Sequence, residues 1–140
     1  MRRVSVVVFI SLGMCLAGCG TRGARPTPTG TVSGILEVRE GLASYYGAAF
    51  HGKTTASGSR FNMNALVAAH PSYPFGTMLR VTNLANGRST SVRILDRGPA
   101  PKAQANGIII DLSRRAADVL GFVQQGHTRV RVEVLKWGNR

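Results

Sequence analysis

The chain has 140 residues and a formal net charge of +12, from 18 lysines and arginines against six aspartates and glutamates. This length is that of one domain of ordinary size. Its two cysteines and three scattered histidines lack the spacing of metal ligands, so we expect neither a metal site nor a cofactor.

Residues 1–18 have the pattern of an export signal. A basic start and an apolar run over 4–16 precede small residues and Cys19. The run is shorter than the roughly 20 apolar residues that span a bilayer, which favours a secretory signal over a membrane helix. Its end resembles the lipobox of bacterial lipoproteins, which implies acylation of Cys19; the alternative is a non-lipidated signal with an incidental cysteine. Cys15 would leave with the signal, so no disulfide is expected.

The mature chain would remain strongly basic. Removal of the signal lowers the basic residues from 18 to 16 and the net charge to +10. Such an excess suits a polyanion, and outside the cytoplasm the candidates are anionic lipid headgroups or cell-wall carboxylates rather than nucleic acid. The alternative is a solvated basic surface.

Residues 19–40 are predicted to be a flexible tether. The stretch 20–33 is rich in Gly, Thr, Pro, Arg and Ser and offers little to bury, and Glu37 and Glu40 fall in the same linker. Gly20 stands where an aspartate would resemble an inner-membrane retention signal. We therefore expect an envelope protein held by lipid in the outer membrane, facing the periplasm, if the organism has one.

Globular patterning is expected from Gly41. Residues 42–46 are predicted to form a first strand, followed by a loop rich in Gly, Ser, Thr and Lys through Arg60. Asn62 is predicted to cap a short helix over 63–69, which the prolines that follow would end.

Stronger β signals follow. Residues 78–84 and 88–95 flank Asn86-Gly87, a dipeptide typical of a type I′ hairpin turn. Ser113 is predicted to open a helix over 114–120, which Gly121 would end. Residues 128–135 alternate as a half-buried strand does. Its predicted inward residues are Val130, Val132 and Val134, and its outward residues Arg129, Arg131 and Glu133. Together these elements favour a mainly β fold, a small barrel with one short and one longer helix on its flank.

The six acidic residues leave two candidates for carboxylate chemistry. Asp96 ends the apolar segment 92–95, and Asp111 ends 108–110. Each aspartate therefore stands where a strand turns at the edge of a core. The other four acids fall in the linker, in the predicted helix (Asp118) or on the outer face of the last strand (Glu133).

Several short blocks of this sequence resemble rare lipoprotein A. They occur in that family's order over 41–135. They are Gly41-Leu42-Ala43-Ser44-Tyr45-Tyr46-Gly47, Phe50-His51-Gly52, Thr55-Ala56, Met63-Asn64-Ala65-Leu66, Ala68-Ala69-His70, Pro74-Phe75-Gly76-Thr77, Val81-Thr82-Asn83, Asp96-Arg97-Gly98-Pro99 and Ile110-Asp111-Leu112-Ser113. The resemblance implies a six-stranded double-psi β-barrel over 41–137, a fold shared with expansins and family 45 endoglucanases.

The resemblance also implies an activity. It is that of an endolytic peptidoglycan transglycosylase, a lyase that cuts between N-acetylmuramic acid and N-acetylglucosamine, leaves 1,6-anhydro ends and prefers glycan strands without stem peptides. Its setting would be septa and daughter-cell separation. Peptidoglycan is then the expected substrate, division proteins are candidate partners, and we expect a monomer.

One carboxylic acid can serve such a reaction. It protonates the glycosidic oxygen and, as carboxylate, takes the proton of the sugar's own 6-hydroxyl, so that a second carboxylate helps without being mandatory. We assign the acid to Asp111, which follows three isoleucines, and the stabilising carboxylate to Asp96, beside Arg97. The alternatives are structural: Asp111 as a helix N-cap or a partner of Arg114, and Asp96 as a turn residue.

Other candidate residues follow the family's pocket. His70 is predicted to orient a carboxylate or bind the sugar, the alternative being a structural histidine. Ser44 and Tyr45 are predicted to line the groove, although strand alternation puts either Tyr45 or Tyr46 in the core. Arg97 is a candidate to bind the lactyl carboxylate of a peptide-free muramic acid.

The sequence departs from the family at two positions. Ser59 and Asn62 stand where the family commonly has Glu and Asp, and neither can act as an acid. Both are assigned to substrate binding here. The departure favours a second hypothesis, a non-catalytic barrel that binds the wall as expansins do. A third, an envelope lipoprotein that recruits division proteins, has little support in the residues.

Overall fold

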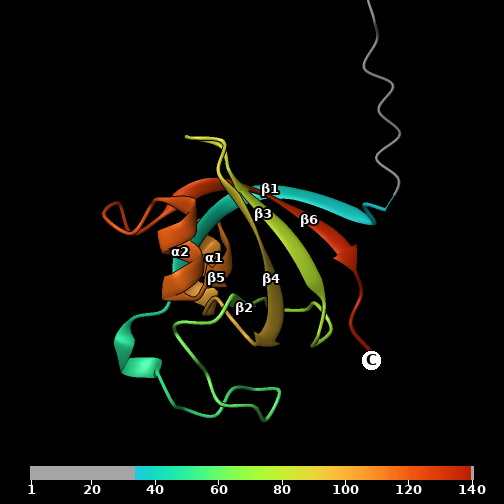
Figure 1. Cartoon of the computed structure of the whole chain (residues 1–140), viewed down its shortest axis with the longest axis vertical. Helices are drawn as coiled ribbons and strands as arrows, with labels where there is room; N and C mark the ends of the chain where they lie inside the picture. The colour runs from blue at the N-terminus through green and yellow to red at the C-terminus, as the bar shows by residue number, and fades with distance from the viewer. Residues whose placement is uncertain (1–33, 140) are drawn as a thin grey trace, which may run out of the picture. The chain divides into compact units, whose positions relative to one another are not determined.

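A computed structural model describes residues 34–139, in which six strands close into one barrel (Figure 1). Around the ring the strand order is β1-β5-β2-β4-β3-β6. The strands are β1 (Glu37–Tyr45), β2 (Val67–Ala69), β3 (Met78–Asn83), β4 (Ser89–Asp96), β5 (Ile108–Leu112) and β6 (Thr128–Lys136). The predicted mainly β barrel is confirmed. The signal peptide, Cys19 and the tether up to residue 33 lie outside the described residues.

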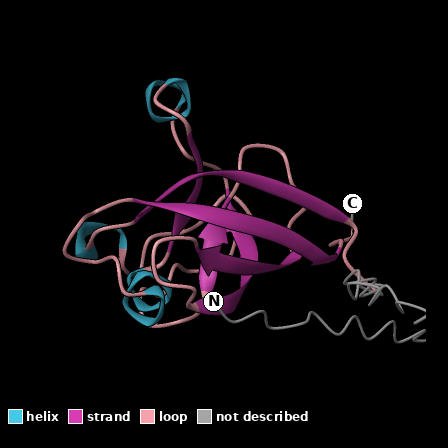
Figure 2. Cartoon of the chain, turned by 90° about the horizontal axis from the view of Figure 1, so that it is seen from above, coloured by secondary structure: helices cyan, strands magenta, loops and turns pink. Residues whose placement is uncertain are grey.

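Three short helical segments lie outside the ring of strands (Figure 2). They are η1 (Ala48–Phe50), α1 (Pro101–Ala105) and α2 (Arg114–Leu120). Helix α2 begins and ends as predicted: the Ser113 hydroxyl accepts from the Ala116 N–H at 3.2 Å, and Gly121 takes the left-handed conformation. Over residues 34–139, no helix has the length and apolarity needed to span a membrane.

The core fills the barrel with aliphatic side chains from every strand. Val130, Val132 and Val134 of β6 are buried, as the alternation predicted. Glu133 lies on the outer face but is only 5% exposed, because Arg80 and Arg131 cover its carboxylate at 2.6 and 3.4 Å. The expectation of a simple outward residue was therefore incomplete.

Strand β1 begins four residues before the predicted start of the domain. Glu37 pairs with Val134 and the antiparallel register with β6 continues to Ala43 opposite Thr128, so Glu37 and Glu40 belong to the barrel and not to a linker. The sequence did not predict this end of the strand because its residues are polar. Glu37 is bound there by Tyr73, which is far away in sequence.

The helix predicted over 63–69 is absent from the described chain, and its last three residues form β2. This short strand pairs parallel with β4 and antiparallel with β5, so tertiary pairing overrides the helical propensity of Val67-Ala68-Ala69. The Asn62 side chain caps no helix. Its Oδ1 accepts from the Asn64 N–H at 2.9 Å within a turn.

The predicted hairpin is confirmed, but its turn type was wrong. Strands β3 and β4 pair antiparallel, and the loop between them is closed by a 2.8 Å bond from the Gly87 N–H to the Asn83 carbonyl. Only Gly87 has a positive φ, whereas a type I′ turn requires one at Asn86 as well. Asn86 instead donates its side-chain amide to the Leu120 carbonyl at 2.9 Å, at the end of α2.

Candidate active site

The two candidate aspartates lie on either side of one residue. Ala69 of β2 is in register with Asp96 of β4 on one side and with Asp111 of β5 on the other. The crossing of three strands thus brings together the two carboxylates that the acid count had singled out. The sequence does not indicate that the two aspartates lie near each other, because they meet across β2, the strand that it failed to predict.

Asp111 is half-buried at the end of β5. The Ser44 hydroxyl of β1 donates a hydrogen bond to its Oδ1. Burial raises the pKa of the Asp111 carboxyl above its usual value, and the Ser44 hydrogen bond opposes that rise. The structural alternatives for Asp111 are not seen among the described residues: Ser113 caps α2, and Arg114 forms no ion pair with Asp111.

Asp96 is held by main-chain donors. Its Oδ1 accepts from the N–H groups of Ala56 and Arg97, each at 2.8 Å. Two main-chain N–H groups therefore fix the position of this side chain. The hydrogen bond from the Arg97 N–H is local, as expected of a turn residue. The hydrogen bond from the Ala56 N–H connects the loop over 54–60 to the end of β4.

The Arg97 side chain does not pair with Asp96, although the two residues are neighbours in sequence. Its guanidinium lies over the Phe75 ring, 3.8 Å from the centroid, and donates to the Tyr73 carbonyl at 2.9 Å. Backbone carbonyls and an aromatic face therefore fix this cation, and the Asp96 carboxylate receives only the main-chain N–H of Arg97.

Tyr46 supplies a hydroxyl at the carboxylates. Its Oη is buried without a hydrogen-bond partner in the described part of the chain. Burial first, and then the charges of Asp96 and Asp111, raise the pKa of the Tyr46 hydroxyl, so it is a donor at neutral pH. A Cβ at Gly98 would lie 3.4 Å from this Oη and 3.2 Å from Asp111 Oδ2, so the loop approaches both groups closely.

The structure shows which of the two neighbouring tyrosines packs against the core. Tyr45 packs edge-on against Phe122 at 6.0 Å and donates its hydroxyl to the Val123 carbonyl at 3.2 Å, although it also borders the hollow of Asp111. Tyr46 is therefore the tyrosine whose hydroxyl lies near the two aspartates. The sequence reasoning named Tyr45 as the binding residue and missed this role.

Two adjoining hollows carry the aspartates. One, of about 590 Å³, is lined by Ser44, Arg97 and Asp111, and the other, of about 280 Å³, by Asp96. Tyr46 and Phe50 line both, so the hollows form one groove, and Phe50 is 48% exposed there. An exposed aromatic ring suits the apolar face of a sugar. Its position in a loop of small residues was the signal that could have identified Phe50.

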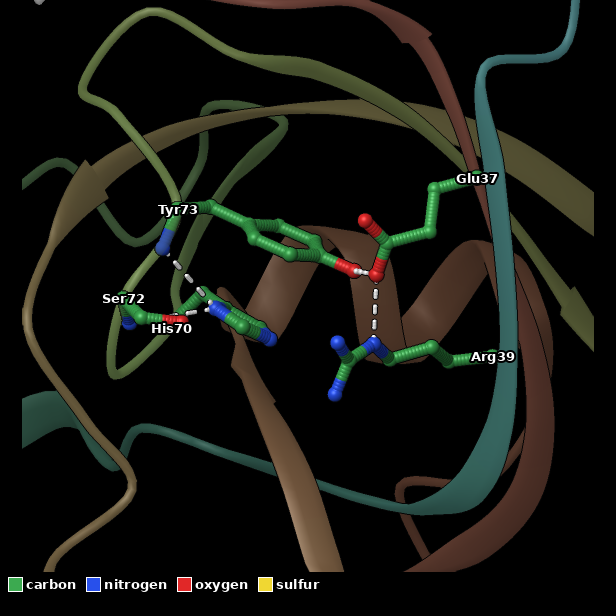
Figure 3. A network of polar contacts seen from close by, with 5 residues as sticks. All are labelled: Glu37, Arg39, His70, Ser72 and Tyr73. Atoms are coloured by element: carbon green, nitrogen blue, oxygen red, sulfur yellow. Dashed lines mark hydrogen bonds and ion pairs between the residues drawn. The ribbon is translucent and has the colours of Figure 1, made fainter.

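His70 does not contact either carboxylate through its ring. It is 6% exposed, its Nδ1 accepts from the N–H groups of Tyr73 and Ser72 at 3.1 and 3.3 Å, and its ring stacks on that of Tyr73 (Figure 3). Burial and then the charge of Arg39 lower the pKa of His70 to about 4, so the imidazole is neutral. Its main-chain N–H does donate to the Asp96 carbonyl at 3.2 Å.

Ser59 and Asn62 lie in the loop that is tied to Asp96. The hydroxyls of Thr55, Ser57 and Ser59 form a triangle with sides of 2.9 to 3.1 Å, and Asn62 bonds within its own turn. These contacts are internal to the loop. Over the described chain, no group of three His, Cys, Asp or Glu side chains could hold a metal ion.

The family model described as lytic transglycolase, a double-psi β-barrel, matches residues 38–132. This chain belongs to the lytic transglycolase family. Its resemblance to rare lipoprotein A is confirmed by relatives such as "Endolytic peptidoglycan transglycosylase RlpA" of Campylobacter jejuni, which is 46% identical over 109 residues. That alignment covers 78% of this lytic transglycolase chain and 38% of the relative. The chain spans less than half the length of the curated relatives that it matches.

Solved structures agree on the fold. The Streptomyces papain inhibitor superposes with a TM-score of 0.58 at 20% identity, over 73% of this chain and 97% of the inhibitor. An expansin of Clavibacter michiganensis gives 0.56 at 20% identity, over 74% of this chain and 53% of the expansin. At such identities the likeness concerns the barrel alone, and the site of this lytic transglycolase domain has to be argued from its own residues.

Proposed function

We propose that this domain is a lytic transglycosylase that cuts the bond between N-acetylmuramic acid and N-acetylglucosamine in peptidoglycan. Support comes from the names of its relatives and from one observation above the others: a half-buried aspartic acid, Asp111, shares a groove with a second aspartate, Asp96. Glycosidic cleavage uses a carboxylic acid with a raised pKa as proton donor, here Asp111, and a second carboxylate near it, here Asp96.

The reaction follows from these roles. Asp111 gives its proton to the glycosidic oxygen, the bond from C1 of the muramic unit to that oxygen breaks, and the glucosamine unit leaves as an alcohol. Asp96 stabilises the positive charge that develops at C1. The Asp111 carboxylate then takes the proton of the 6-hydroxyl as O6 bonds to C1, which gives the 1,6-anhydro end and restores the acid without water.

Tyr46 is placed to assist both steps. Its buried, unpartnered hydroxyl can donate to the Asp111 carboxylate after the first proton transfer, which balances the charge that this side chain acquires. Phe50 offers a ring to the sugar at the junction of the two hollows.

The test uses residues 34–140 with purified peptide-free glycan strands, and products are identified by mass spectrometry. We expect 1,6-anhydro ends, and we expect them to fall at least about 100-fold in Asp111→Asn and in Asp96→Asn. Asp118→Asn is the matched control, because Asp118 is an exposed residue of α2 that lines neither hollow. Full cleavage by Asp111→Asn would show that Asp111 is not the general acid.

A second function has its own supporting observation. Ser59 and Asn62 replace two acids common in the family and bond only within their loop, which is what a barrel that binds glycan without cutting it would permit. This reading predicts retention of the domain on peptide-free glycan with no anhydro products at any pH. The product assay therefore separates the two functions.

We propose further that residues 1–18 are a signal peptide, that Cys19 is acylated and that the lipid holds the protein in the envelope, at the outer membrane if the organism has one. The lipobox-like end of the apolar run supports this placement. Labelling with a radioactive fatty acid, lost in Cys19→Ser, is the expected result. Label that persists in this variant would contradict it.

A further inference from the structure

A further hollow on the described surface is lined by neither aspartate. It has a volume of about 780 Å³, and its principal lining residues are Glu37, Arg39, Tyr73, Phe75, Arg97 and Trp137. Arg97 also lines the hollow of Asp111, so the two adjoin along this side chain. A glycan strand bound at Asp111 can therefore continue past Arg97 into the larger hollow.

One wall of this hollow is aromatic. Trp137, just beyond β6, is 37% exposed and meets Tyr73 edge-on at 5.2 Å. It is the only tryptophan in the chain. A rigid, partly exposed indole ring on a pocket wall loses little entropy when a sugar ring covers it. Gly138 fixes the neighbouring backbone against Thr77, whose Oγ1 accepts from the Gly138 N–H at 3.0 Å.

The polar groups of the hollow favour a carboxylate ligand. The Glu37 carboxylate already accepts from the Tyr73 hydroxyl at 2.8 Å and from Arg39 Nε at 2.5 Å (Figure 3). Arg39 uses Nε for this bond, and Arg97 uses Nη1 for the carbonyls of His70 and Tyr73, so each guanidinium has further N–H groups to offer a ligand. The lining of the hollow contains two guanidinium groups and one carboxylate, so it keeps one net positive charge.

We propose that this hollow is a second glycan subsite, which holds a muramic acid unit away from the bond that is cut. Trp137 stacks on the sugar ring, and Arg39 with Arg97 binds the carboxylate of the lactyl group. The inference rests on the proposed function for its substrate class, while Arg39 and Trp137 are separate from the cleavage machinery at Asp111 and Arg97 borders both hollows.

The single tryptophan makes the subsite directly measurable. Residues 34–140 carrying Asp111→Asn are titrated with peptide-free glycan oligosaccharides, and the emission of Trp137 is followed. We expect a saturable change in emission, with the dissociation constant raised about tenfold by Arg39→Gln. Arg129→Gln, an exposed arginine on the outer face of β6, is the matched control and should leave the constant unchanged.

Two further ligands identify the source of the carboxylate. Strands that keep their stem peptides have no free lactyl carboxylate, and chitin oligosaccharides have no carboxylate, so we expect both to bind more weakly than peptide-free strands. Tighter binding of peptide-bearing strands would overturn the proposal, and so would an unchanged emission with every ligand. Trp137→Phe should keep most of the affinity and Trp137→Ala should lose it, as measured by calorimetry.

The outcomes separate the subsite from the cleavage activity. An emission change without anhydro products from the unsubstituted domain would leave the subsite in place and refute the transglycosylase. Products formed with normal kinetics but no emission change would refute the subsite alone.

Discussion

At the scale of single residues, the protonation of Asp111 depends on Ser44. The hydroxyl of Ser44 bonds the ionised carboxylate and so holds the pKa of Asp111 below the value that burial alone would give. Ser44→Ala should therefore raise this pKa further. In the proposed mechanism Asp111 is the general acid and works only when protonated, so the alkaline limb of kcat/KM should move to higher pH, by about half a unit to one unit.

The matched variant for this position is Ser44→Thr, which retains the hydroxyl and should retain the pH profile. The measurement is the pH dependence of anhydro-product formation. An alkaline limb that moves to lower pH in Ser44→Ala would show that Asp111 is not the acid that this limb reports.

Gly98 controls the space between Asp111 and Tyr46. Its φ of +153° is a conformation that other residues rarely adopt, and an added Cβ would lie 3.2 Å from Asp111 Oδ2. Gly98→Ala should lower kcat/KM by about tenfold or more by displacing these two groups. Gly126→Ala also places an alanine at a positive φ, of +77°, but with nothing within 4 Å, so it should reduce stability slightly and leave kcat/KM unchanged. Equal activity losses in the two variants would contradict this reading.

The carboxylates were predictable from the sequence because the chain has so few acids, and strand ends could be recognised near both. The orientation of Arg97 was not predictable, because its partners are the Phe75 ring and the Tyr73 carbonyl, which belong to another loop. The same holds for Tyr46, whose neighbours Asp96 and Asp111 come from two different strands.

At the scale of elements, β3 and β6 are joined on their outer face by Glu133. Arg80 and then Arg131 lower the pKa of the Glu133 carboxyl, so its stabilising contribution is present above the unfolded value, about 4.3, and is lost as pH falls through the lower folded value. Glu133→Gln should lower the melting temperature by about 2–5 °C at pH 7.

Scanning calorimetry at several pH values checks this linkage. The difference between the two proteins should shrink as the pH falls below about 4 and should also shrink in high salt. A difference that grows on acidification would show that the carboxylate is not the stabilising group.

Among the elements, alternation predicted β6 and the hairpin because each has a long, regular pattern. Strand β2 has only three residues, and Val67-Ala68-Ala69 has no periodicity to recognise. It becomes a strand only because β4 and β5 leave a gap that its backbone fills. The type I′ turn failed for a similar reason, since Asn86 is committed to the end of α2.

At the scale of the whole molecule, closure of the barrel depends on the first residues of β1. The chain pairs with β6 from Leu36, whose N–H donates to the Val134 carbonyl at 2.8 Å, and the ladder runs through Glu37 to Ala43. A chain that begins at Gly41, the predicted start, should be less stable than one that begins at Gly34 by about 2–4 kcal/mol.

Urea unfolding of the two chains measures this difference. The longer chain should also keep the hollow of Trp137, since Glu37 and Arg39 line it, whereas the shorter chain should lose glycan-dependent emission. Coincident unfolding curves would show that the strand works without its first four residues. At this scale the sequence predicted a small barrel but not its strand order, because no local pattern reports which distant strands pair.

The position of β1 in the ring also has a kinetic consequence. Its only neighbours are β5 and β6, so the earliest strand of the domain stays without a partner until the latest strands arrive. Such non-local pairing gives a high contact order, and we expect refolding on the scale of about milliseconds to seconds in stopped-flow experiments. During synthesis the open edges of β1 would remain available for mispairing, and the final strand is the one that removes them.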